Sequence, residues 1–300
     1  MQSLRGMLVV DFSRYLPGAF ASRELLGLGA RVVCVEPPGG DPMRTTAPAW
    51  DAALRAGKES IEVDLKQDPA PALELLGQAD VVLESFRPGV ASRLGIGPEQ
   101  APERTVYCSI TGFGLGGRHE QRAGHDLNYL GWAGTLWDTA PSLPPVQVAD
   151  LAAGALGAAT KILAALLERE RTGRGAHLVV SMTHGSHRLV AHRRGGDAVP
   201  RMLTGGLASY RIYETADGRH LTVAALEPHF FHRLTELLGR AELAERQSDA
   251  DQEALAAELA AIFATRPLAA WLELFDGEDV CVGPVATIAE AAADLAAAPR

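Results

Sequence analysis

The chain has 300 residues, of which 47% are hydrophobic and 22% are charged, a composition typical of a globular protein. Its formal net charge of −9 and the lack of a basic run argue against a nucleic-acid surface. The three cysteines, Cys34, Cys108 and Cys281, lie far apart in apolar runs. We therefore expect buried thiols in a reducing compartment, with neither a disulfide framework nor a metal site.

The N-terminus shows no signal-peptide core, and no uncharged apolar run reaches the roughly 18 residues that a membrane-spanning helix needs. The final residues, Ala298–Arg300, match no peroxisomal address. The sequence thus predicts a cytoplasmic protein with no membrane partner.

The first part of the chain predicts strands that alternate with helices. Met7–Phe12 is a short apolar strand, and Pro17–Leu28 is a helix with proline in its first turn. Arg31–Glu36 is the next strand, which completes a β-α-β unit. Strand patterns return at 79–84 and at 105–110. This alternation predicts an α/β fold with a Rossmann-like parallel sheet.

A long alanine-rich helix is predicted from Asp150 to about Arg171, followed by glycines that end it and by a strand at 177–182. The large domain is predicted to span residues 1–192. A run of Gly, Pro and Arg then marks a linker at 193–210.

The rest of the chain predicts a smaller α+β domain at 211–285, followed by a C-terminal segment at 286–300. A hairpin is predicted from strands at 211–214 and 220–225. A helical stretch follows at 230–275, and a terminal strand at 280–285.

The β-α-β unit ends in an acidic residue, Glu36, which suggests a nicotinamide cofactor. Such a cofactor needs a glycine-rich turn so that its pyrophosphate can approach the backbone. The segment Tyr15–Ser22 has one glycine where the dinucleotide pattern needs three, so we set this hypothesis aside.

Several motifs together resemble the class III coenzyme A (CoA) transferase family, which includes formyl-CoA transferase and α-methylacyl-CoA racemase. The resemblance covers nearly the whole chain and implies an interlocked homodimer. Its motifs lie at Asp11–Arg44, Gly57–Lys66, Glu84–Gly95, Ser109–Gly114, Tyr213–Gly218 and Asp279–Val285.

The segment Gly124–Leu130, Gly-His-Asp-Leu-Asn-Tyr-Leu, is similar to the racemase branch, because transferases usually carry an aromatic residue where His125 stands. The same branch pairs this histidine with an aspartate, matched here by Asp150, and has a third acidic position, matched by Glu227. The resemblance therefore implies inversion of a 2-methylacyl-CoA thioester through an enolate, with His125 and Asp150 as acid and base.

Inversion at an α-carbon needs one acid–base group on each face of a planar enolate. Histidine suits this task because it changes charge near neutral pH. The start of a helix lowers the pKa of a carboxyl such as Asp150, whereas burial raises it, and we expect burial to dominate. Gly124 and the turn into Asp126 could present N–H groups to the thioester oxygen. The resemblance also implies that Glu227 of a partner subunit orients His125.

The resemblance assigns a set of residues to the CoA moiety, and it implies no further cofactor and no metal. Arginine and lysine suit phosphate groups by geometry and charge. This set consists of Leu54, Arg55, Ala56, Gly57, Lys58, Arg87 and Arg93, together with Gly124, Asp126 and Tyr129.

Each candidate also has a structural interpretation. His125 could be a core histidine, Asp150 an N-cap, Glu227 the start of a helix, and Arg87 and Arg93 surface charges.

Three features depart from the racemase pattern. Pro37 stands where an arginine usually packs on adenine, and Val146 replaces an asparagine. The chain also continues less far beyond the Gly-Pro-Val strand than is usual in the family. Pro37 and the short continuation favour one alternative function, a non-catalytic acyl-CoA-binding protein. The other alternative is a CoA-transferase with Asp150 as nucleophile.

Overall fold

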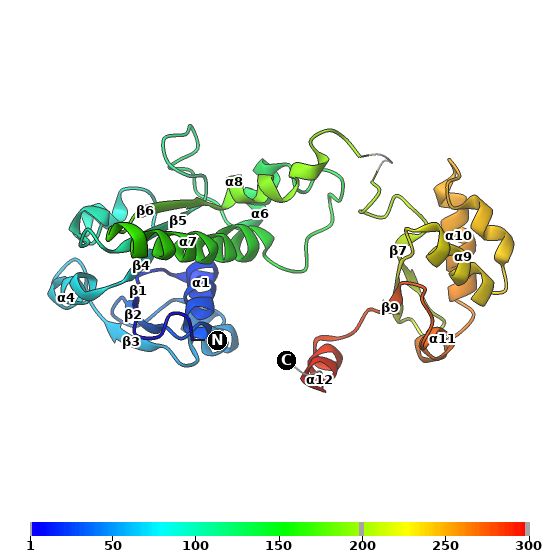
Figure 1. Cartoon of the computed structure of the whole chain (residues 1–300), viewed down its shortest axis with the longest axis horizontal. Coiled ribbons are helices and arrows are strands. Elements are labelled where there is room, and N and C mark those ends of the chain that lie inside the picture. Colours follow the sequence, from blue (N-terminus) through cyan, green and yellow to red (C-terminus); the bar gives the residue numbers. More distant parts are fainter. Residues whose placement is uncertain (1, 198–200, 298–300) are drawn as a thin grey trace. The chain divides into compact units, whose positions relative to one another are not determined.

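The computed structural model describes residues 2–197 and 201–297, and the chain divides into two compact units between Arg194 and Gly195 (Figure 1). The predicted linker, 193–210, spans this division, and its residues 198–200 lie outside the described residues. Residues 298–300 of the predicted C-terminal segment also lie outside them.

The first unit is built on a six-stranded sheet in the order β3-β2-β1-β4-β5-β6, in which every neighbouring pair is parallel. The predicted parallel α/β fold is confirmed. Both faces of the central strands are buried, as their valine-rich runs require. The strands are β1 Leu8–Asp11, β2 Arg31–Glu36, β3 Glu59–Glu62, β4 Val81–Glu84, β5 Val106–Thr111 and β6 His177–Ser181.

Strand β3 was not predicted, because the sequence Glu-Ser-Ile-Glu lacks an apolar run. It lies at the edge of the sheet, where it pairs with β2. The polar side chains of an edge strand are exposed, so its sequence carries little strand signal.

The helices of the first unit connect these strands. The predicted long helix runs from Ala149 to Thr172, and its first eight residues, η2, are a π-helix. The strand predicted at 177–182 ends at Ser181, and Met182 begins a helix, α8, that was not predicted. The helices are α1 Tyr15–Gly27, α2 Met43–Thr46, α3 Pro48–Arg55, α4 Ala70–Gln78, α5 Val90–Arg93, η1 Pro98–Gln100, α6 Asp126–Ala133, η2 Ala149–Leu156, α7 Gly157–Thr172, α8 Met182–Leu189 and η3 Ala191–Arg193.

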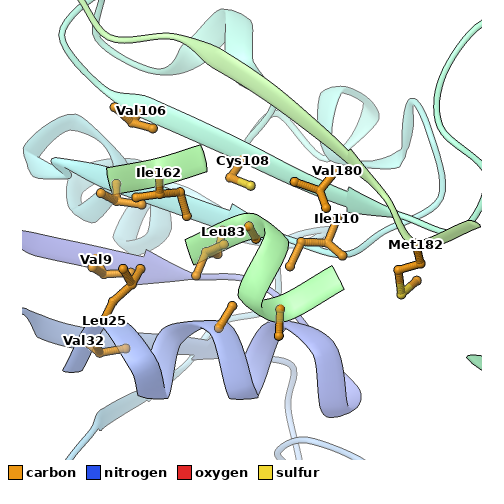
Figure 2. Close-up of a cluster of buried hydrophobic side chains, with 14 of the residues drawn as sticks. Val9, Leu25, Val32, Leu83, Val106, Cys108, Ile110, Ile162, Val180 and Met182 are labelled. Atoms are coloured by element: carbon orange, nitrogen blue, oxygen red, sulfur yellow. The ribbon is translucent and has the colours of Figure 1, made fainter. Parts of the chain in front are cut away.

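Two apolar layers cover the sheet of this unit. On one face α1 and α7 pack against the strands, with Leu25 beside Val9 and Val32, and Ile162 near Cys108 (Figure 2). On the other face α4 and α5 cover a second cluster. Successive residues of β1 point to opposite faces, so one short strand serves both clusters.

One helix among the described residues, Ala149–Thr172, is long and apolar enough to cross a membrane by length and composition, and the bent pair α10–α11 passes the same test jointly. Ala149, Ala155, Ala158 and Ile162 are buried in the core of the first unit. Packing against the sheet and α1 accounts for this buried face of the helix.

The second unit has an antiparallel sheet in the order β7-β8-β9, and it includes the predicted hairpin. Its helices enclose a core around Phe231, Phe263 and Trp271. The elements are β7 Tyr210–Glu214, β8 His220–Ala224, α9 Pro228–Leu237, η4 Ala241–Arg246, α10 Gln252–Phe263, α11 Leu268–Phe275, β9 Val282–Pro284 and α12 Ile288–Ala297.

The expectation of three buried thiols is wrong for Cys281. Cys34 and Cys108 lie in central strands and are buried, whereas Cys281 is exposed. It follows the buried Val280 and has a left-handed φ of 50°, so its side chain points away from the core that an apolar run suggested.

The contact between α8 and η2 predicts opposite effects for two glycine substitutions. A Cβ at Gly185 would lie 2.7 Å from Ala153 Cβ and 3.1 Å from Ala153 O, whereas a Cβ at Gly77 of α4 would meet nothing within 4 Å. We expect Gly185→Ala to lower the free energy of unfolding by about 1–3 kcal/mol. Gly77→Ala should raise it by about 0.5–1 kcal/mol. Urea unfolding followed by circular dichroism measures both, and equal stability of the two variants would contradict this packing.

Candidate active site

A pocket of about 500 Å³ lies at the carboxyl ends of β1, β4 and β5. The sheet order places β1 beside β4, and the chain leaves these two strands toward opposite edges of the sheet. In an open parallel sheet this switch point creates a crevice in which ligands bind. The pocket walls include Arg14 and Tyr15 after β1, residues 85–88 after β4, and residues 110–112 at the end of β5.

His125 and Asp150 both line this pocket. His125 directly precedes α6, and its backbone N–H donates to Asn128 Oδ1 at 3.0 Å. Its side chain is exposed, which excludes the interpretation as a core histidine. The helix start therefore fixes the backbone of His125, which lies exposed in the pocket wall.

Asp150 is the second residue of η2, and the N-cap of that segment is Val148, so Asp150 is not the helix cap. Its backbone N–H donates to Asp126 Oδ1 at 2.9 Å. Burial, reinforced by the negative charge of Asp126, raises the pKa of Asp150 to about 7. This is the direction expected if burial outweighs the helix terminus. The carboxyl can therefore hold or release a proton near neutral pH.

The pocket wall beside His125 is set by Tyr129. Its hydroxyl donates to Gly124 O at 2.5 Å. A Cβ at Gly112 would lie 2.5 Å from the Tyr129 ring, and one at Gly124 would lie 2.8 Å from it. Both positions therefore need glycine, and the buried ring holds the chain that leads into His125.

One N–H group of the turn expected to face a thioester oxygen, that of His125, is already engaged, and the role of the Gly124 and Asp126 N–H groups stays a prediction. The His125 N–H is engaged by Asn128, and the Gly124 carbonyl accepts the Tyr129 hydroxyl. The Asp126 carboxylate accepts the N–H of Asp150. Asp126 thus acts on Asp150 through its charge and its hydrogen bond.

Of the basic residues assigned to CoA by resemblance, Arg87 lines the pocket. Arg55 is engaged inside the unit, since its guanidinium contacts Glu36 at 2.6 Å, Asp51 at 2.5 Å and Asp41 at 3.2 Å. Three carboxylates around one guanidinium leave it little capacity for a phosphate group.

Lys58 is also engaged inside the unit. Its Nζ donates to Ala19 O and Ser22 Oγ, both at 2.7 Å, and burial lowers its pKa although the charge of Asp11 opposes that shift. Arg93 is exposed at the end of α5.

The other residues of the predicted 54–58 segment complete the end of α3 and the turn into β3. Leu54 is buried, and Ala56 and Gly57 form the exposed turn, where Gly57 has a φ of 83°. None of the five residues lines the pocket that contains His125 and Asp150.

The sequence did not single out several pocket residues, notably Arg14, Tyr15 and Arg122. Tyr15 has a left-handed φ of 65°, which is rare for a residue with a Cβ, and is 51% exposed. The guanidinium of Arg122 lies 5.1 Å from the centre of the Trp132 ring. A position directly after a buried strand is the signal that could have found Arg14 and Tyr15.

A second, smaller pocket of about 270 Å³ lies at the ends of β2 and β3. Pro37 and Lys66 are among its lining residues, and it shares Arg14 and Phe86 with the larger pocket. The two hollows therefore have a wall in common.

Glu227 belongs to the second unit and directly precedes α9. Its side chain is exposed and makes no capping hydrogen bond to that helix. Burial raises the pKa of Cys281, and the negative charges of Asp279 and Glu227 raise it further. The interpretation of Glu227 as the start of a helix is therefore confirmed for its backbone, whereas its side chain stays free of the helix.

The described residues, 2–197 and 201–297, contain no group of three His, Cys, Asp or Glu side chains placed to hold a metal ion. The residues that line the pocket combine acid–base side chains, arginines and apolar side chains.

Comparison with known proteins defines the family. The model of CoA-transferase family III matches residues 4–300, and the chain belongs to this family. The α-methylacyl-CoA racemase of Homo sapiens is 37% identical over 96% of this chain and 79% of the relative. An acetyl-CoA:oxalate CoA-transferase of Acetobacter aceti is 34% identical over 96% of this chain and 82% of its own length.

The crystal structure of a hypothetical protein from Mycobacterium tuberculosis superposes with a TM-score of 0.82 at 30% identity, covering 100% of this chain and 87% of that one. A CAIB/BAIF family protein from Brucella suis gives a TM-score of 0.81 at 31% identity, covering 97% and 86%. The resemblance stated from the motifs is confirmed.

The contact between Asp126 and Asp150 predicts how the pKa of Asp150 responds to a substitution of Asp126. Wild-type Asp150 should titrate near pH 7, so that it is largely protonated at pH 6 and largely ionised at pH 8. Asp126→Asn keeps an oxygen acceptor but removes the charge, so the pKa of Asp150 should fall by roughly one unit. Carbon-13 NMR of labelled aspartate measures this, with exposed Asp68→Asn as the control that leaves it unchanged. Titration of wild-type Asp150 near pH 4 would contradict the burial argument.

Proposed function

We propose that this protein is a racemase or epimerase of 2-methylacyl-CoA thioesters. The observation that carries the proposal is the presence in one pocket of His125 and of Asp150, whose pKa is raised to about 7. The racemases among its relatives support the same conclusion.

The reaction needs only proton transfers. A base removes the proton from the α-carbon, and the C–H electron pair moves toward the thioester oxygen to give a planar enolate. The acid on the opposite face then donates a proton to the α-carbon, and the electrons return. The substrate keeps its composition. In the enzyme the base has gained a proton and the acid has lost one, so the protonation states of the two groups are exchanged. Exchange with water restores the starting state.

The raised pKa of Asp150 matters because this carboxyl must act in both directions. A carboxyl with an ordinary pKa of about 4 is almost fully ionised at neutral pH and so rarely has a proton to donate. A group with its pKa near the working pH populates both forms. His125 supplies the complementary group, since imidazole also donates and accepts protons in this range.

The pair of adjoining pockets supports an elongated thioester ligand. The acyl group and thioester belong beside His125 and Asp150 in the larger pocket. The nucleoside belongs in the smaller pocket, where Pro37 replaces the arginine expected beside adenine. We propose no cofactor beyond the CoA moiety of the substrate.

An interlocked homodimer is part of this proposal. Glu227 of a partner subunit would approach His125 and hold its imidazole in the orientation that proton transfer needs. The exposure of the Glu227 side chain and its lack of a capping hydrogen bond to α9 support this assignment.

CoA transfer is the second candidate, because CoA-transferases are also among the relatives. In that reaction the Asp150 carboxylate attacks the thioester carbon, forms an anhydride and releases the CoA thiolate. The thiolate then attacks the aspartyl carbonyl, which gives an aspartyl-CoA thioester and a free carboxylate product. Transfer needs the ionised carboxylate, and a carboxyl with a pKa of about 7 is about half ionised at neutral pH, so trapping of an acylated Asp150 and not its pKa distinguishes the two candidates.

The racemase proposal predicts exchange of the α-proton with solvent. NMR of a 2-methylacyl-CoA in D₂O should show loss of the α-proton signal with the wild-type protein. His125→Ala and Asp150→Ala should each slow this exchange by about 10²–10⁴-fold while acyl-CoA binding is retained. His192→Ala, an exposed histidine outside the pocket, is the matched control and should exchange normally.

Absence of exchange in the wild type would contradict racemisation. Trapping of acylated Asp150 by hydroxylamine in that case would establish transfer, whereas tight acyl-CoA binding with neither reaction would indicate a binding protein.

The partner-subunit role of Glu227 predicts complementation. Glu227→Ala should lower activity by roughly 100-fold through loss of imidazole orientation. When His125→Ala and Glu227→Ala chains are co-expressed and the heterodimer is purified through two different tags, one site keeps both native residues. Activity near half that of the wild type is expected. An inactive heterodimer would show that Glu227 does not act across subunits.

A further inference from the structure

Arg14 lies at the junction of the two pockets. It lines both of them, as does Phe86, and its guanidinium carbon is 5.6 Å from the centre of the Phe86 ring. An arginine over an aromatic face is held in a defined plane, because the ring attracts the cation and restricts its rotamers. The junction therefore presents an oriented guanidinium.

Hydrogen bonds hold the backbone of the loop that carries Arg14. Phe12–Arg14 donate their three N–H groups to Leu83 O at 2.8 Å, Asp11 Oδ1 at 2.9 Å and Ser85 Oγ at 3.1 Å. The Ser85 hydroxyl donates in turn to Arg14 O at 3.2 Å. Both polar groups of the Arg14 backbone are thus bound to one serine, so the Cα is held in place before a ligand arrives.

Arg14 has no acidic partner among residues 2–197 and 201–297, since no carboxylate there lies within ion-pair distance of it. Arg55, one of the three arginines that the resemblance assigned to CoA, is surrounded by three carboxylates. Lys58 is bound to Ser22 and Ala19. The charge of Arg14 is therefore available to an anionic ligand.

We propose that Arg14 binds the diphosphate of the CoA moiety. This inference rests on the acyl-CoA binding put forward under the proposed function. The diphosphate links the adenosine to the pantetheine arm. When the nucleoside occupies the smaller pocket and the thioester lies near Asp150, the diphosphate crosses the wall that the two pockets share. A guanidinium meets phosphate oxygens with two parallel hydrogen bonds, which suits a diphosphate at this position.

The other arginines of the site have different placements. Arg87 and Arg122 line the larger pocket and not the smaller one, and Arg122 is stacked on Trp132. Arg14 is therefore the arginine placed to distinguish a ligand that has the diphosphate from one that lacks it.

The test is isothermal titration calorimetry with three probes: isobutyryl-CoA, isobutyryl-dephospho-CoA and isobutyryl-pantetheine. The first two contain the diphosphate, and only the first has the 3′-phosphate. Arg14→Ala should weaken binding of the first two by the same factor, about 10–100-fold, and leave the third unchanged. Arg14→Lys should lose less, because it keeps the charge without the planar pair of donors. Arg5→Ala, an exposed arginine at the amino end of the sheet, is the matched control and should bind all three normally.

Each other pattern overturns the proposal. Unchanged binding of isobutyryl-CoA to Arg14→Ala would exclude a diphosphate contact. Loss confined to isobutyryl-CoA would assign Arg14 to the 3′-phosphate, and equal loss of all three probes would indicate a damaged pocket, which thermal unfolding without ligand checks independently. Failure of the wild type to bind isobutyryl-CoA would instead refute the proposed function itself.

Discussion

The hydrogen bond from the Asp150 N–H to the Asp126 carboxylate joins the starts of the two helices that carry the candidate acid–base groups. Asp126 begins α6 directly after His125, and Asp150 lies in η2. The same carboxylate helps raise the pKa of Asp150 to about 7, after burial. This contact therefore links the two helix starts and adds to the effect of burial on the pKa of Asp150.

The sheet forms the crevice in which this contact lies. Because β1 and β4 are neighbours from which the chain departs in opposite directions, the loops after them open a crevice at their carboxyl ends. Close packing of η2 against α8 at Gly185, and of Tyr129 against Gly112, brings α6 and η2 to that crevice. Glycine is needed at these approaches because a single methyl group would separate the elements.

Sequence patterns predicted those features of this protein that depend on residues close together in the chain. Valine-rich runs predict buried parallel strands, and the Gly-His-Asp motif predicted His125 because its residues are contiguous. The edge strand β3 was missed because polar exposed residues carry no such pattern. Arg55 and Lys58 were assigned to phosphate, yet both are bound inside the unit by groups distant in sequence. Arg14 was missed because its position in the pocket depends on the order of the strands in the sheet, which the sequence patterns do not give.

The central claim is that two acid–base groups serve opposite faces of one α-carbon. Its most direct test starts from a single enantiomer of a 2-methylacyl-CoA in D₂O and separates the two enantiomers at early times. A two-base site predicts that the inverted product carries deuterium at the α-carbon while the remaining substrate carries almost none. Inverted product that retains the original proton, or equal labelling of both enantiomers from the outset, would contradict the claim.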